Sequence, residues 1–195
     1  EFAHLFHPYL GDEGRWLGEG LATYWQNVLR ARSGLIASDE AWDELHDGFT
    51  RGRAQTRGGT TLAQASSVMM REHTFLRTYW AGAAYWFKVD VELRRASAGK
   101  LGVEEALRRF RGCCLAPPRE WTPVEFVTKL DSLMGTDVFA RRWREADAQT
   151  RFPDLAPYYA ELGIVVDSDA TLRVDDSAPG ASVRRAILTP HSDTH

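Results

Sequence analysis

The sequence predicts a mainly α-helical protein, a helical bundle with a small β appendage near its C-terminal end. Two observations predict the bundle. Apolar residues recur every three or four positions through most of the chain, and one stretch, 79–87, is apolar on nearly all sides. The appendage is predicted because short runs rich in β-branched residues begin at Ile164. With 195 residues, of which 44% are apolar, the chain is long enough to bury a core of its own.

The first three helices are expected within the first 50 residues. Residues 1–10 carry apolar side chains at helical spacing. Residues 16–33 form a long amphipathic stretch with arginines near its end and Gly34 after it, which is typical of a helix C-terminus. A third helix is expected over 38–49, and the polar, glycine-rich segment 51–61 is predicted to be a loop.

The central helix is expected over residues 75–97. Its first half includes the apolar stretch 79–87 and should therefore lie in the middle of the bundle. Its second half is charged, and we expect its basic pair, Arg94 and Arg95, on the surface.

Shorter helices are expected around the central one, over 62–70, 103–111, 122–134, 137–148 and 153–162. The clearest start is at Thr122, because Pro123 follows it and Glu125 stands at the third helical position, where its side chain can complete a capping box.

Three short runs near the C-terminal end are predicted to be strands: 164–166, 171–174 and 183–188. We therefore divide the chain into a helical unit, residues 1–163, and a short β appendage with a tail, residues 164–195.

Charge and composition exclude several classes of protein. Twenty-four basic and 27 acidic residues leave a net charge of −3, which is not that of a strongly basic nucleic-acid binder. The longest apolar run, Tyr79 to Phe87, is far too short to span a membrane. Cys113 and Cys114 are expected to be free thiols, because adjacent cysteines rarely bridge each other, and two cannot form a four-thiolate zinc site.

The chain begins with Glu1-Phe2-Ala3-His4, which matches the last four residues of His-Glu-x-x-His. In that motif two histidines one helical turn apart bind zinc and the glutamate acts as general base. Alone the match is weak, since a Glu and a His at this spacing often occur by chance. Because the motif is cut at its first residue and no Met precedes it, we expect a fragment of a larger enzyme that is inactive by itself.

Two further segments fit the same chemistry. Trp16-Leu17-Gly18-Glu19-Gly20-Leu21-Ala22-Thr23-Tyr24 lies on the next predicted helix, and 14 residues separate His4 from Glu19. A helix hairpin would bring Glu19 back to His4 as a further ligand and leave one zinc position open for water. In Tyr79-Trp80-Ala81-Gly82, the Tyr79 phenol is a candidate hydrogen-bond donor to a developing oxyanion.

Taken in order, these motifs resemble the gluzincin metallopeptidases, thermolysin-like zinc enzymes that include the large zinc aminopeptidases. The glycyl aminopeptidase family is the most similar, because weaker matches to it follow at Val89 to Arg94, Leu133 to Phe139 and Tyr158 to Ile164. The resemblance covers roughly residues 1–164.

This resemblance implies that residues 1–163 are the C-terminal, helical subdomain of a thermolysin-like peptidase, truncated at its N-terminal side. It assigns Glu1 as general base and acid, His4 and Glu19 as zinc ligands, and Tyr79 as the oxyanion donor. The implied cofactor is zinc in the intact protein, and the fragment can lack it. The implied substrate is a peptide, cleaved as by an aminopeptidase.

Some alternatives stay open. His7, one turn after His4, could chelate the metal with it, be a solvated histidine, or support the ligand His4 without touching the metal. Tyr85 competes with Tyr79 for the catalytic role. The alternative function is a metal-free helical scaffold or protein-interaction domain, suggested by the incomplete motif and the short spacer between His4 and Glu19. No nucleic acid or membrane span is expected. Either the cytoplasm or the periplasm of a bacterium fits the sequence.

Overall fold

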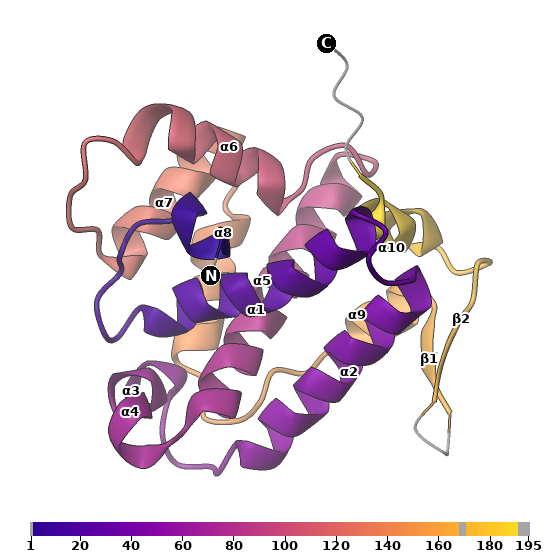
Figure 1. The fold of residues 1–195 in the computed structure, drawn as a ribbon, viewed down its shortest axis with the longest axis horizontal. Helices are drawn as coiled ribbons and strands as arrows, with labels where there is room; N and C mark the ends of the chain where they lie inside the picture. The colour runs from indigo at the N-terminus through magenta and orange to yellow at the C-terminus, as the bar shows by residue number, and fades with distance from the viewer. Residues whose placement is uncertain (1, 168–170, 191–195) are drawn as a thin grey trace.

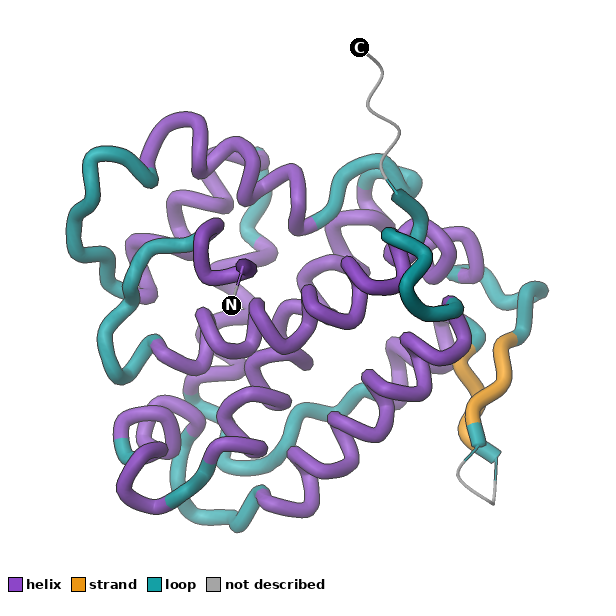
Figure 2. Tube along the Cα trace, in the orientation of Figure 1, coloured by secondary structure: helices purple, strands orange, loops and turns teal. Residues whose placement is uncertain are grey.

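The computed structural model describes residues 2–167 and 171–190 and confirms the predicted fold class, mainly helical with a small sheet (Figure 1). The elements are a 3₁₀ helix η1 (Phe2–Phe6), α1 (Arg15–Arg32), α2 (Ser38–Gln55), α3 (Leu62–Ser67), α4 (Met69–Glu72), α5 (Phe75–Ala96), α6 (Val103–Cys114), α7 (Pro123–Met134), α8 (Val138–Asp147), α9 (Ala156–Leu162), β1 (Ile164–Val166), β2 (Leu172–Val174) and α10 (Ala181–Leu188). The two strands pair antiparallel, with Val165 opposite Arg173. Figure 2 shows this hairpin at one edge of the helical body.

Helix α5 runs through the middle of the bundle, and α1 crosses it at close range (Figure 1). Two glycines allow this approach. A Cβ atom added to Gly82 would overlap the carbonyl oxygen of Trp16, and one added to Gly20 would lie 2.8 Å from the backbone nitrogen of Ala83. Because neither glycine has a side chain, the two helix backbones touch, and the segment around Glu19 is held against the centre of the protein.

Tryptophans fill the space around this crossing. Four of them lie on α1 and α5 and are at most 7% exposed: Trp16, Trp25, Trp80 and Trp86. The indole nitrogen of Trp86 donates a hydrogen bond to the carbonyl oxygen of Leu17 at 2.8 Å, so the ring both fills the core and joins the two helices. The predicted burial of the central helix is therefore confirmed.

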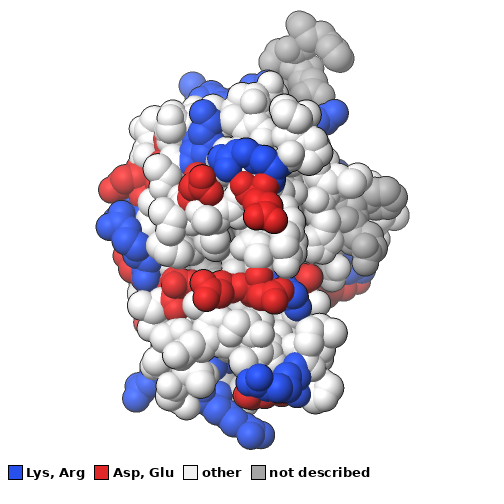
Figure 3. Space-filling model, turned by 90° about the vertical axis from the view of Figure 1, so that its left-hand side faces the viewer, with Lys and Arg blue, Asp and Glu red and all other residues white. Residues whose placement is uncertain are grey.

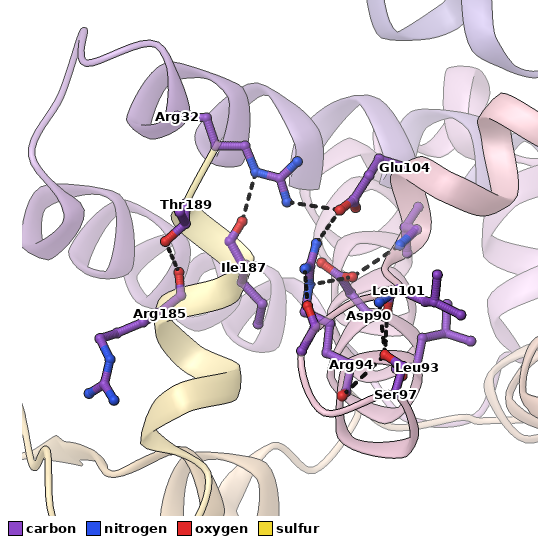
Figure 4. A network of polar contacts seen from close by, with 12 residues as sticks. Arg32, Asp90, Leu93, Arg94, Ser97, Leu101, Glu104, Arg185, Ile187 and Thr189 are labelled. Atoms are coloured by element: carbon purple, nitrogen blue, oxygen red, sulfur yellow. Dashed lines mark hydrogen bonds and ion pairs between the residues drawn. The ribbon is translucent and has the colours of Figure 1, made fainter. Parts of the chain in front are cut away.

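A buried polar network ties the C-terminal half of α5 to its neighbours (Figure 4). The carboxylate of Asp90 accepts hydrogen bonds from the Tyr24 hydroxyl at 2.8 Å, Arg94 Nε at 3.1 Å and the Val103 backbone nitrogen at 3.0 Å. Arg94 also donates to Glu104 at 2.6 Å. The prediction that Arg94 lies on the surface is wrong, because its side chain is only 1% exposed and its charge is neutralised inside the protein.

The same network reaches the end of the described chain. Arg32 at the end of α1 lies 3.5 Å from Glu104 and donates through Nε to the carbonyl oxygen of Ile187 in α10 at 2.8 Å. Figure 4 shows Arg32 between these two partners. Helix α10 is thus held on the bundle by apolar contacts and by the hydrogen bond from the Arg32 guanidinium to the Ile187 carbonyl.

The predicted strand over 183–188 is wrong, because these residues belong to α10. The buried side chains of that helix recur at helical spacing: Ala181, Val183, Arg184, Ile187 and Leu188. Arg184 donates to the carbonyl oxygen of Leu162 at 2.6 Å, a tertiary contact that the local pattern does not reveal. The division of the chain at 163/164 stays a prediction.

Two boundaries also differ from the predictions. Helix α2 continues to Gln55, so the first residues of the predicted loop over 51–61 are helical, and Gly52 is buried where the helix packs under Trp80. The predicted first helix over 1–10 is a short 3₁₀ helix, η1, and Glu1 lies outside the described residues. The capping box at Thr122 and Glu125 is present as predicted.

The expectation of two free thiols is wrong, since Cys113 and Cys114 are joined to each other by a disulfide. The expectation rested on the spacing of adjacent residues, whose Cα atoms are 3.7 Å apart here, closer than in most disulfides. The local geometry at the end of α6 nevertheless brings the two sulfurs together.

The surface carries charges of both signs. On the face drawn in Figure 3, a band of acidic side chains crosses the middle, and basic side chains gather in separate groups above and below it. None of the helices in the described part of the chain combines the length and the apolar character that crossing a membrane requires.

Candidate functional site

The structure brings His4 and Glu19 together. His4 lies on η1, which packs against α1, and Glu19 lies in the second turn of α1. His4 Nε2 is 3.7 Å from Glu19 Oε2, and the two side chains are 37% and 24% exposed. An imidazole and a carboxylate from segments 14 residues apart thus share one partly shielded site, as the predicted hairpin requires.

Two hydrogen bonds of His7 connect the His4 ring to the backbone at Pro8. Its Nε2 is 3.1 Å from His4 Nδ1, and its Nδ1 is 2.8 Å from the carbonyl oxygen of Pro8. Burial lowers the pKa of His7 below its ordinary value; the hydrogen bond to the Pro8 carbonyl partly offsets this, and neighbouring His4 adds a smaller lowering.

The two glycines that flank Glu19 have separate packing roles. A Cβ atom on Gly18 would lie 2.6 Å from Cε1 and 3.1 Å from Nε2 of His7, so only glycine leaves room for that ring. Gly20, on the other side of Glu19, faces Gly82 at the crossing with α5. The Gly-Glu-Gly sequence therefore lets α1 pack closely against His7 on one side and α5 on the other.

A cavity of about 110 Å³ opens at this point, and its lining includes His4, His7 and Glu19 together with Tyr9 and Arg15. A larger cavity of about 750 Å³ lies beside the end of α6 and the start of α7, and it shares no lining residue with the first. Size favours the larger cavity as a binding site, but the smaller one holds the imidazole and carboxylate groups needed for metal binding. We therefore take the smaller cavity as the candidate site.

The pair of donors has the chemistry and the separation of two zinc ligands. Donor atoms that each lie about 2.0–2.2 Å from a tetrahedral zinc ion are about 3.3–3.6 Å apart, close to the 3.7 Å between His4 Nε2 and Glu19 Oε2. Residues 2–167 and 171–190 contain no group of three or more His, Cys, Asp or Glu placed to hold a metal ion. Two donors thus fit zinc, and a third protein ligand would come from outside the described residues.

Of the two predicted catalytic residues, the structure describes only Tyr79. Glu1 lies outside the described residues. Tyr79 is half-buried near the start of α5, one turn before Gly82, with its ring 6.4 Å from that of Phe75 in an edge-on arrangement. Its role as an oxyanion donor stays a prediction.

The competing tyrosine has a structural partner. Tyr85 is 1% exposed and its hydroxyl donates a hydrogen bond to the carbonyl oxygen of Phe139 at 3.0 Å. Burial raises the pKa of this phenol well above its ordinary value, and nearby Asp131 adds to the shift. Tyr85 therefore belongs to the core between α5 and α8.

Sequence reasoning considered His7 as a metal ligand, as a solvated histidine or as a histidine that supports the ligand His4, and it did not choose among these roles; the structure places His7 in contact with His4. The available signal was the spacing of three residues between the two histidines. What it could not convey was that Gly18 makes room for the His7 ring behind His4.

Comparison with known proteins supports the family suggested by the motifs. A model of the M61 glycyl aminopeptidase family matches residues 6–87, which run from the end of η1 into the middle of α5 and make up less than half of the chain. The match includes Glu19 and Tyr79 and leaves out His4. No curated protein matches the chain.

Proposed function

We propose that the protein hydrolyses peptide bonds with the help of a zinc ion held by His4 and Glu19, and that it acts as an aminopeptidase of the gluzincin type. The observation that carries the proposal is the 3.7 Å separation of the His4 imidazole and the Glu19 carboxylate. The similarity of residues 6–87 to the glycyl aminopeptidases supports the choice of reaction and of peptide substrates.

In this proposal each residue has one task. The His4 imidazole and the Glu19 carboxylate would hold the metal. When bound, zinc supplies a Lewis acid that lowers the pKa of a water molecule toward 7 and polarises the substrate carbonyl. Glu1 would take the proton of the attacking water and pass it to the departing amine. Tyr79 would donate its phenolic hydrogen to the oxygen that gains negative charge.

The alternative is a metal-free helical scaffold or interaction domain. Its support is that only two suitable donors come together among the described residues. The alternative predicts no specific zinc binding at His4 and Glu19, so a metal-binding experiment separates the two functions.

We expect a single histidine added before Glu1 to strengthen zinc binding, because it completes His-Glu-x-x-His and supplies a third ligand. Zinc affinity is measured by competition with a chelating dye, for residues 1–195 and for the extended chain. In the extended chain, Glu19→Gln should lower the zinc affinity. Loss of a residue that only hydrogen-bonds to a metal ligand costs roughly 10–100-fold in affinity, and loss of a ligand itself should cost at least as much. Cleavage of fluorogenic aminoacyl substrates by the extended chain should disappear with Glu1→Gln.

Glu44→Gln is the matched control, since Glu44 is on α2, is paired with Arg30 and is not among the residues that line the candidate cavity. It should leave zinc binding unchanged. The proposal is wrong if the added histidine does not raise zinc affinity and Glu19→Gln has no more effect than Glu44→Gln, a result that would favour the scaffold.

A further inference from the structure

The hydrogen bonds around His7 determine where the protons sit. The carbonyl oxygen of Pro8 can only accept, so the hydrogen of that 2.8 Å contact belongs to His7 Nδ1. In a neutral imidazole the other nitrogen is then an acceptor. His7 Nε2 therefore accepts, and the hydrogen of its 3.1 Å contact with His4 belongs to His4 Nδ1.

The same reasoning fixes the free nitrogen of His4. With the hydrogen on Nδ1, neutral His4 carries a lone pair on Nε2, and this is the atom that lies 3.7 Å from the Glu19 carboxylate. A lone pair and an anionic oxygen repel each other when nothing lies between them, and a cation between them removes the repulsion. The proton arrangement thus prepares both groups to donate electrons to a metal ion.

Packing holds His7 in the orientation that this arrangement needs. Its ring lies against the backbone of α1 at Gly18, where a Cβ atom would be 2.6 Å from Cε1. His7 is also the residue directly before Pro8, whose carbonyl it contacts. The ring is therefore held from the α1 side and by its own backbone segment.

We propose that His7 is a positioning residue that fixes His4 in the tautomer with hydrogen on Nδ1, so that His4 Nε2 is free to bind the metal beside Glu19. The metal-binding part of this proposal rests on the proposed function. The tautomer itself is a property of the metal-free protein and can be measured without zinc.

The first test is the tautomer of His4, read from long-range proton–nitrogen correlations of the imidazole in metal-free, ¹⁵N-labelled protein. The pH is kept about two units above the ordinary histidine pKa of roughly 6.5, so that the rings are neutral. We expect His4 with hydrogen on Nδ1 and an unprotonated Nε2, and the same pattern for His7. Hydrogen on His4 Nε2 in the wild-type protein would overturn the proposal, whatever the variants do.

Variants separate the hydrogen bond from the packing of the ring. His7→Phe keeps a flat ring beside Gly18 but removes the acceptor, so His4 should shift toward the tautomer with hydrogen on Nε2. His7→Gln offers its side-chain oxygen as an acceptor and should restore the wild-type pattern. Tyr9→Phe, at the rim of the same cavity, is the matched control and should leave His4 unchanged. An unchanged tautomer in His7→Phe would also overturn the proposal.

The second test is zinc affinity, measured with the histidine-extended chain. His7→Phe should weaken zinc binding by about 10–100-fold, the usual cost of losing the partner that orients a metal-bound histidine, and His7→Gln by much less. If wild-type protein shows the expected tautomer and its loss in His7→Phe but binds no zinc, the proposed function fails and the orienting role of His7 stands. If zinc binds equally well to wild type and His7→Phe, the proposed role of His7 in metal binding fails while the peptidase proposal survives.

Discussion

Replacing Asp90 with alanine is expected to lower the free energy of unfolding by about 3–5 kcal/mol, the usual cost of removing one partner from a buried ion pair. The Asp90 carboxylate is fully buried and accepts three hydrogen bonds, from Tyr24, Arg94 and Val103. Its removal leaves the Tyr24 hydroxyl and the Val103 backbone nitrogen unsatisfied. It also leaves Arg94, 1% exposed, with Glu104 as its remaining acidic partner. Urea unfolding followed by circular dichroism measures the change.

Asp167→Ala is the matched control, because Asp167 also pairs with an arginine, Arg173 at 3.0 Å, but both side chains are well exposed. Exposed pairs contribute roughly 0–1 kcal/mol, so this variant should unfold at nearly the wild-type urea concentration. Equal effects of the two substitutions would show that burial of the Asp90 network does not contribute to stability as we expect.

Replacing Gly82 with alanine is expected to destabilise the protein by about 1–3 kcal/mol, the range for overpacking a core. The new methyl group would overlap the carbonyl oxygen of Trp16 and lie 2.8 Å from the Cα atom of Gly20. Both are backbone atoms, so no side-chain rotation can relieve the overlap and the two helices must move apart. This cost should exceed the roughly 1 kcal/mol that alanine gains over glycine within a helix. Thermal unfolding measures the result.

The control for Gly82 is Gly112→Ala, the same substitution in helix α6. A Cβ atom on Gly112 meets nothing within 4 Å. Only the helical preference of alanine then operates, and we expect this variant to be more stable by up to about 1 kcal/mol. The opposite signs of the two results are the test. If Gly82→Ala is also stabilising, α1 and α5 do not depend on close backbone contact at this point.

Most helices could be predicted because their information is local. The apolar stripe of residues 16–33, the fully apolar stretch 79–87 and the capping box at Thr122 each depend on residues within a few turns of one another. Helix α10 was missed because its valine, isoleucine and leucine residues suggested a strand, although its buried residues recur at helical spacing. Contacts with distant residues, such as the hydrogen bond from Arg184 to the Leu162 carbonyl, hold this helix against the rest of the protein.

The candidate site divides in the same way. The sequence motifs pointed to the Glu19 carboxylate and to the His4 imidazole. The structure shows that these two groups lie close together. The hydrogen bonds of His7 could not be predicted, since they depend on which ring nitrogen faces which neighbour. The burial of Arg94 was also missed, because charged residues at the end of a helix are usually solvated, and only the acidic partners on two helices explain its position.

By itself, the sequence determined the helical class of the protein and the central place of residues 79–87, and it named candidate metal ligands, because periodicity and side-chain chemistry are local properties. The tertiary structure decided which polar groups face one another. It placed His4 beside Glu19 and His7 behind His4, and it buried Arg94 between Asp90 and Glu104. The position of His7 depends on the room that Gly18 leaves for its ring, and the position of Glu19 depends on the crossing of α1 and α5 at Gly20 and Gly82. The burial of Arg94 depends on acidic partners from α5 and α6.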